Sequence, residues 1–161
     1  MTETINVLQG ASTKEEKYQS LLPQLEALVT GEPDLVANVA NIVAALHQVF
    51  GHLWIGVYFV KGNDLVLGPF QGPVACSRIG FGKGVCGYCW QHEKPVVVPD
   101  VNAFPGHIAC NSESKSEIVL PVFRNGKVFM VLDIDSDQPA HFDAIDLEYL
   151  QKVTGIIEKL T

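Results

Sequence analysis

The chain has 161 residues and a formal net charge of −7 at pH 7, with only 11 Lys and Arg residues. This length is enough for one domain whose core needs neither disulfides nor a metal to be stable. The scarcity of basic residues argues against nucleic-acid partners, because such binding depends largely on neutralising phosphates. No run of about 18 apolar residues predicts a membrane span. The first residues lack the basic and apolar regions of an export signal, so we expect a cytoplasmic protein.

Residues 1–50 are predicted to hold two helices. In the first, over residues 14–29, apolar side chains recur at helical spacing, although Pro23 weakens the prediction. The second, over residues 35–50, carries an apolar stripe on one face and ends at Gly51.

Over residues 52–141 the hydrophobic period changes from that of helices to that of strands. The β-rich runs are 53–60, 64–68, 74–79, 95–98, 117–123 and 127–135. The first three predict a meander. A glycine-dense stretch, 80–84, leads into a predicted short helix at 85–92. Between the last two runs, Asn125–Gly126 is the two-residue signal for a type I′ hairpin.

The last predicted element is a helix within residues 142–161, with Asp143 as its N-cap. The order of two helices, several strands and a final helix is typical of an α+β domain with an antiparallel sheet flanked by helices. No repeat, low-complexity tract or linker divides the chain, so we interpret residues 1–161 as a single domain.

A long irregular segment, residues 99–116, precedes the hairpin. Loops of this length in compact domains are usually functional lids or disordered insertions. This one contains Cys110 and apolar residues that can pack. The sequence therefore favours a lid that covers a small-molecule site, rather than a disordered insertion.

Cys76, Cys86 and Cys110 are expected to be reduced in the cytosol, where thiols are more suited to chemistry than to stapling a fold. A fourth cysteine, Cys89, forms a CxxC motif with Cys86. A thioredoxin-type motif would need a βαβ context, and a structural zinc site usually has a second closely spaced pair. We therefore favour the remaining interpretation, in which Cys89 is an ordinary residue of the core or the surface.

Several motifs within residues 54–143 resemble those of one known family. They are Cys76, Gly82–Gly87, Asp100–Cys110, Ser116–Pro121 and Leu132–Ser136. In combination they resemble the free methionine-(R)-sulfoxide reductases built on a GAF domain. The resemblance implies a GAF-like α+β fold with a long active-site loop. It also implies free L-methionine (R)-sulfoxide as substrate, thioredoxin as reductant, and no bound cofactor or metal.

Reduction of a sulfoxide needs a thiolate that attacks sulfur and a proton donor for the departing oxygen. It also needs a second thiol that captures the resulting sulfenic acid as a disulfide. By resemblance, Cys110 is the nucleophile and Cys76 the resolving thiol, with Cys86 as an alternative or a relay. A Cys110–Cys76 disulfide is the expected oxidised product.

Free methionine is a zwitterion, and Asp133 and Asp135 are candidates to bind its ammonium group. They are two apart on a predicted strand and so share a face, where carboxylates in an apolar run are costly unless a cation or solvent meets them. By resemblance, Glu117 belongs to the same pocket. Convergence of the three would raise the pKa of at least one, which makes it a candidate proton donor. Glu117 is the preferred donor and Asp135 the next, whereas Asp133 mainly binds the ammonium.

The hairpin register poses a difficulty for this grouping. A two-residue turn pairs Arg124 with Lys127 and thereby turns Glu117 away from both aspartates. One extra residue must shift the register. We predict a β-bulge at Pro121, which cannot donate to a ladder, and an unbroken ladder over 117–123 would contradict it.

Trp54 and Tyr58, four apart on the first strand, share a face and resemble the aromatic residues that enclose the methyl and sulfoxide end of the substrate. His107 precedes Cys110 by three residues and is a candidate to stabilise its thiolate, although a loop histidine more often makes a structural hydrogen bond. The stretch 80–87 lacks the P-loop and dinucleotide patterns, so no phosphate-bearing cofactor is predicted.

The alternative from another class is a GAF sensor that binds a small ligand, or senses oxidants through the same thiols, and passes a conformational change to a partner. Such a sensor does not require three carboxylates beside a thiol, so the sequence favours the enzyme. A homodimer is a further expectation.

Overall fold

The computed structural model describes residues 3–10 and 12–161. Within them the helices are α1 (Lys14–Leu28), α2 (Leu35–Phe50), α3 (Gly84–His92) and α4 (Ala144–Glu158), with one 3-10 turn, η1 (Val101–Ala103). The strands are β1 (Trp54–Lys61), β2 (Asp64–Gln71), β3 (Arg78–Gly80), β4 (Val96–Val98), β5 (Ser116–Arg124) and β6 (Lys127–Ser136). They form one antiparallel sheet in the order β3-β2-β1-β6-β5-β4, which confirms the predicted α+β class. None of the helices in this described part is long and apolar enough to cross a membrane.

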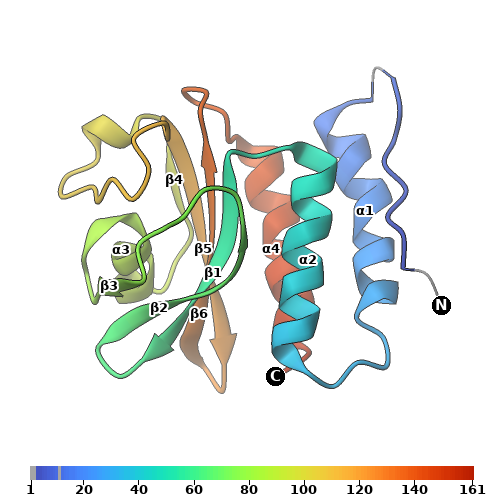
Figure 1. The fold of residues 1–161 in the computed structure, drawn as a ribbon, viewed down its shortest axis with the longest axis horizontal. Coiled ribbons are helices and arrows are strands. Elements are labelled where there is room, and N and C mark those ends of the chain that lie inside the picture. Colours follow the sequence, from blue (N-terminus) through green and yellow to red (C-terminus); the bar gives the residue numbers. More distant parts are fainter. Residues whose placement is uncertain (1–2, 11) are drawn as a thin grey trace.

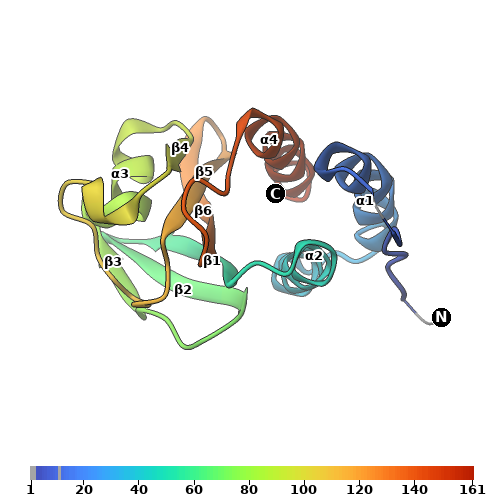
Figure 2. The same cartoon turned by 90° about the horizontal axis from the view of Figure 1, so that it is seen from above.

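The sheet has a different cover on each face. Helices α1, α2 and α4 lie on one side, and α3 with the long loop before β5 lies on the other (Figures 1 and 2). Along β1, Ile55 and Val57 are buried against the helices, whereas Trp54 and Tyr58 point to the α3 side. Along β1, both faces of the sheet are therefore buried, as expected from the alternation of side chains along a strand.

Local signals in the sequence account for the helix boundaries. Asp34 caps α2 by accepting a hydrogen bond from the Ala37 amide at 2.9 Å, and the helix ends at Gly51 with φ of 64°. Asp143 starts α4 in a capping box with Asp146, as predicted for this N-cap. Helix α1 forms as predicted despite the internal Pro23.

The third predicted strand is shorter than expected. The pattern predicted a strand over 74–79, but β3 covers only Arg78–Gly80, and the side chain of Val74 is 87% exposed. The reason is that β2 continues to Gln71, opposite Ile55 of β1, so the chain turns later than the pattern predicts. The segment between β2 and β3 is instead a loop that carries Cys76.

The β5–β6 hairpin contains the predicted register shift, but at another place. Pairing is regular from Glu117 to Val122, and the extra residue is Phe129 of β6, between the pairs Val122–Met130 and Phe123–Val128. Placing the bulge at Pro121 was therefore wrong. Strand β4 pairs only with residues 117–119, so Pro121 has a strand on one side only, where a missing N–H is tolerated. The shift still turns Glu117 to the face of Asp133 and Asp135, directly opposite Asp135.

A buried histidine lies where α2 leads into β1. His52 is 4% exposed and packs against the rings of Phe50, His141 and Phe142. Neither ring nitrogen has a hydrogen-bond partner among the residues the structure describes. Burial, followed by repulsion from His141, lowers the pKa of His52 to about 3.

We predict that His52 makes the fold sensitive to acid. Because its pKa is lowered in the folded state, only the unfolded state takes up a proton as the pH falls below about 6.5. Between pH 7 and pH 5 this selectively stabilises the unfolded chain by about 2 kcal/mol, and His52→Phe should remove that contribution. Urea unfolding at both pH values measures it. His92→Gln, at an exposed histidine, is the control, and an equal pH dependence in the two variants would contradict the prediction.

Candidate active site

A pocket opens on the α3 side of the sheet, beneath the loop 99–115 and beside the loop 72–77. It encloses about 500 Å³, counting the part that is open to solvent. All the predicted site residues except Cys76 line it: Trp54, Tyr58, Cys86, Cys110, Glu117, Asp133 and Asp135. Strands β1, β5 and β6, helix α3 and the long loop thus bring together side chains that are far apart in the sequence.

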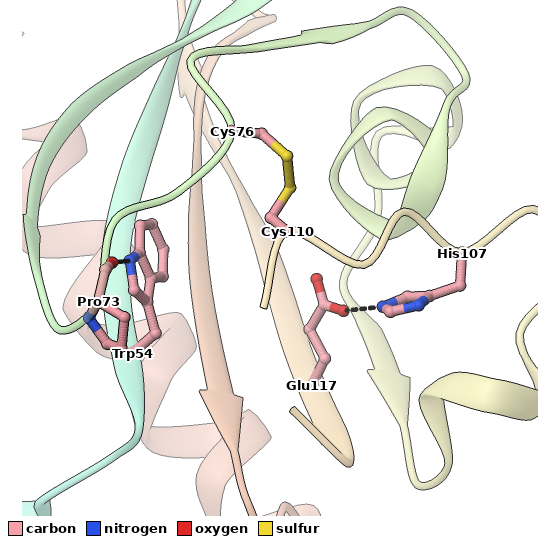
Figure 3. Close-up of a disulfide and its surroundings, with 6 residues drawn as sticks. All are labelled: Trp54, Pro73, Cys76, His107, Cys110 and Glu117. Atoms are coloured by element: carbon pink, nitrogen blue, oxygen red, sulfur yellow. Dashed lines mark hydrogen bonds and ion pairs between the residues drawn. A yellow bond between two sulfur atoms is a disulfide. The ribbon is translucent and has the colours of Figure 1, made fainter. Parts of the chain in front are cut away.

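A disulfide joins the two loops at this pocket. Cys76, from the loop between β2 and β3, is bonded to Cys110 of the long loop, with the two Cα atoms 5.4 Å apart (Figure 3). Both residues are partly exposed. The bond is the Cys110–Cys76 pairing expected from the resemblance, and it places an oxidised dithiol where solvent can reach it.

The other two cysteines are free and buried in α3. Cys86 lies in the first turn of α3 and lines the pocket, whereas Cys89 is fully buried in the apolar cluster beneath it. Burial, and then the nearby Asp133, raise the pKa of Cys86 well above its ordinary value. Cys86 is therefore a protonated thiol at neutral pH and a weak nucleophile in this arrangement. The strands around α3 are antiparallel, so the CxxC motif lacks a thioredoxin-type βαβ setting.

Three acidic side chains converge on the pocket floor. Glu117 and Asp133 are each 6% exposed, and an oxygen of each lies within 4.8 Å of the Cys86 sulfur and of the other. These atoms are the strongest candidate ligands for a metal in the described residues. Asp135 accepts a hydrogen bond from the hydroxyl of Ser114 at 2.6 Å.

Burial sets the protonation of these carboxyls. It raises the pKa of Glu117, with repulsion from Asp135 as the next cause. Burial also raises the pKa of Asp133 and is reinforced by repulsion from Glu117 and Asp135. Burial also raises the pKa of Asp135, but the hydrogen bond from Ser114 and the nearby His107 lower it in part. The group therefore retains protons at a pH where exposed carboxyls have lost them.

Two polar residues tie the long loop to the carboxylates. Nε2 of His107 lies 3.6 Å from a carboxylate oxygen of Glu117 (Figure 3), and Ser114 donates to Asp135. The interpretation of this loop as a lid is consistent with these contacts. The sequence analysis missed Ser114, because a serine in a polar loop carries no signal until its partner is known.

The aromatic residues form one wall of the pocket. The rings of Trp54 and Tyr58 stack with their centroids 5.9 Å apart. Between them, Gly56 leaves room for the indole, because a Cβ atom there would lie 2.5 Å from Cη2 of Trp54. The indole N–H donates to the carbonyl oxygen of Pro73 at 3.1 Å, in the loop that carries Cys76 (Figure 3).

Comparison with known proteins identifies relatives over the whole length of the chain. Residues 34–159 match the model of the GAF domain family. The chain is 52% identical to GAF domain-containing protein A of Dictyostelium discoideum, over 98% of this chain and 99% of the relative. It is 43% identical to the free methionine-R-sulfoxide reductase of Saccharomyces cerevisiae, over 91% of this chain and 86% of the relative.

A solved structure shares both the sequence and the fold. It is the free methionine-R-sulfoxide reductase from Neisseria meningitidis in complex with its substrate, which matches with a TM-score of 0.93 and 48% identity over 98% of this chain and 95% of that chain. The resemblance predicted from the motifs is confirmed. The chain belongs to the GAF-domain family of free methionine-(R)-sulfoxide reductases.

Proposed function

We propose that this protein reduces free L-methionine (R)-sulfoxide to L-methionine with a cysteine sulfenic acid and disulfide mechanism. The observation that carries the proposal is the Cys76–Cys110 disulfide at a pocket floored by three buried carboxyl groups. A disulfide in that position is the expected oxidised product of such a reaction. The relative that is named as this reductase and contains its substrate supports the choice of substrate.

In the proposed reaction the thiolate of Cys110 attacks the sulfoxide sulfur. The oxygen is transferred to Cys110 as a sulfenic acid, and methionine leaves as the thioether. The thiol of Cys76 then attacks the Cys110 sulfur and expels water, which leaves the disulfide. Overall, one sulfoxide and two thiols give one thioether, one disulfide and one water, so the step consumes two electrons from the enzyme.

The carboxyl groups have separate roles in this mechanism. Glu117, whose pKa is raised by burial, donates the proton that the sulfoxide oxygen needs, with Asp135 as the second candidate. Asp133 binds the substrate ammonium, a cation that compensates the cost of its buried charge. Trp54 and Tyr58 enclose the methyl and sulfoxide end, where an apolar wall suits the thioether product.

The cycle closes when an external dithiol reduces the Cys76–Cys110 bond by thiol–disulfide exchange. We propose thioredoxin as this reductant, because the bond joins two partly exposed residues and two electrons must be supplied in each turnover. Cys86 stays an alternative resolving thiol. No bound cofactor takes part in these steps.

The first prediction of the proposed function concerns the thiols. Thioredoxin-coupled NADPH oxidation with the separated free (R)- and (S)-sulfoxides should show turnover of the (R) form alone. Cys110→Ser should remove it, because a hydroxyl at neutral pH is a far weaker nucleophile than a thiolate. Cys76→Ser should slow the thioredoxin-dependent cycle, whereas Cys89→Ser, which alters a thiol outside the pocket, should leave it unchanged. If neither epimer turns over while peroxide forms the disulfide, the protein is a redox sensor instead.

The second prediction separates the carboxylates by steady-state kinetics with dithiothreitol as reductant. Glu117→Gln removes a proton donor and should lower kcat by roughly 10² to 10⁴, with a smaller effect on KM. Asp133→Asn removes a charge that binds the ground state and should mainly raise KM. Glu113→Gln, at an exposed position in the loop that precedes β5, is the matched control. Equal losses of kcat in both pocket variants would contradict the division of roles.

The third prediction is that Asp133 costs stability. Because its pKa is raised in the folded state, folding at pH 8 requires either a bound proton or a buried charge, and stability falls as the pH rises above the unfolded value of about 3.9. Asp133→Asn should therefore increase the free energy of unfolding at pH 8 by about 1 to 3 kcal/mol while impairing turnover. Urea unfolding measures this change. Asp137→Asn, at an exposed position, should show no such gain, and a destabilised Asp133→Asn chain would overturn the prediction.

A further inference from the structure

The pocket floor holds a group of ligand atoms that the reductase cycle uses only in part. The sulfur of Cys86 and one oxygen each of Glu117 and Asp133 lie within 4.8 Å of one another. They come from α3, β5 and β6, so three separate elements converge on one point. All three residues are buried. Cys86 sits in a packed helix and the carboxyls on paired strands, which makes the arrangement rigid.

A second observation indicates that this group can bind a cation. Oδ1 of Asp133 is buried and has no hydrogen-bond partner among the described residues, although Asp133 lines the pocket. An orphaned buried carboxylate oxygen is costly. Among the ion pairs of the described residues, only one involves a pocket carboxylate. It joins His107 to Glu117, so Asp133 has no basic partner there.

The mixture of ligand types selects the kind of cation. One sulfur and two carboxylate oxygens suit Zn²⁺, which accepts both and takes four ligands in a tetrahedron. Mg²⁺ and Ca²⁺ prefer oxygen ligands alone and more of them. We propose that Zn²⁺ binds this pocket through Cys86, Glu117 and Asp133, with the fourth position open to the cavity. On coordination the thiol proton of Cys86 passes to solvent.

This site differs from a structural zinc site built on the CxxC motif. Cys89 is fully buried in the apolar cluster and does not line the pocket, and Cys76 and Cys110 are bonded to each other. Only Cys86 of the motif faces the carboxylates. Because the ligands stay free when the disulfide is formed, the site exists in the oxidised enzyme.

The proposal also gives Zn²⁺ a regulatory effect, and this part rests on the proposed function. The metal would use the Asp133 carboxylate that we assign to the substrate ammonium. Zn²⁺ and free methionine therefore exclude one another. Free Zn²⁺ would act as a competitive inhibitor of the reductase.

Calorimetric titration of the metal-free, oxidised chain with Zn²⁺ tests the site without any turnover. In that form only Cys86 and Cys89 are free thiols, which a thiol count verifies. We expect one Zn²⁺ per chain. Cys86→Ser and Asp133→Asn should each weaken binding at least about tenfold, since even outer-shell losses reach that size. The matched control Cys89→Ser should bind as the wild type does, and millimolar Mg²⁺ should not compete.

The ligand assignment has an independent readout in Co²⁺ substitution. A sulfur-to-cobalt charge-transfer band should appear in the wild type and in Cys89→Ser, and should be absent from Cys86→Ser. Glu117→Gln is a second carboxylate variant should Asp133→Asn fail to fold, as judged by circular dichroism. No Zn²⁺ binding by the wild type, binding that survives Cys86→Ser, or a band lost only with Cys89→Ser would each overturn the proposal.

The regulatory part is tested by repeating the Zn²⁺ titration with excess free L-methionine. We expect a weaker apparent affinity that returns when methionine is removed. Unchanged Zn²⁺ affinity in a chain that turns over the sulfoxide would overturn mutual exclusion. Absence of turnover would count against the proposed function alone, because the titration of the oxidised chain needs no substrate.

Discussion

The site depends on one extra residue in the β5–β6 hairpin. Phe129 shifts the pairing of the two strands by one position, and this places Glu117 opposite Asp135 on the α3 side of the sheet. Without the shift, Glu117 would point into the core beneath α2 and α4, and the neighbouring Ile118 would point into the pocket. The convergence of the three carboxyls is thus a property of backbone register, and the loops that carry Cys76 and Cys110 are placed over it.

The rest of the fold must offset the unfavourable free energy of burying these carboxyls. Buried carboxyls oppose folding unless a proton or a cation accompanies them. On the far side of the sheet, apolar side chains of α1, α2 and α4 form a large core. Among the described residues, the one buried acid on that side is Asp146, and it is fully satisfied, because it accepts a hydrogen bond from Tyr18 at 2.8 Å and pairs with Lys14. The helical layer therefore stabilises the domain, and the α3 layer carries the chemistry.

Much of this could be predicted from the sequence because the signals are local. Asp34, Gly51 and Asp143 mark helix ends through their own caps, and Asn125–Gly126 marks the hairpin through its turn. The common face of Asp133 and Asp135 follows from their spacing alone. The predicted bulge was correct in its effect, which is to turn Glu117 toward the two aspartates. The sequence itself reveals the need for a shift, because a hairpin without one would point Glu117 away from them.

The features that were not predicted depend on contacts between distant segments. The bulge lies at Phe129 and not at Pro121. The short β4 leaves Pro121 with only one neighbouring strand, so the missing N–H of this proline is tolerated without a bulge. The extent of β2 and β3 depends on pairing with β1 and not on composition. The hydrogen bond from Ser114 to Asp135 is likewise decided only when the lid meets the sheet.

The hydrogen bond between the Trp54 indole and the Pro73 carbonyl joins the pocket wall to the loop of Cys76, three residues further along. The indole is therefore in direct contact with the loop whose position the disulfide restrains. Trp54 also stacks on Tyr58 and Phe70, so its ring has a defined environment on its other sides. We therefore expect reduction of the disulfide to change the surroundings of this chromophore, so that the fluorescence of Trp54 reports the oxidation state of the protein without a label.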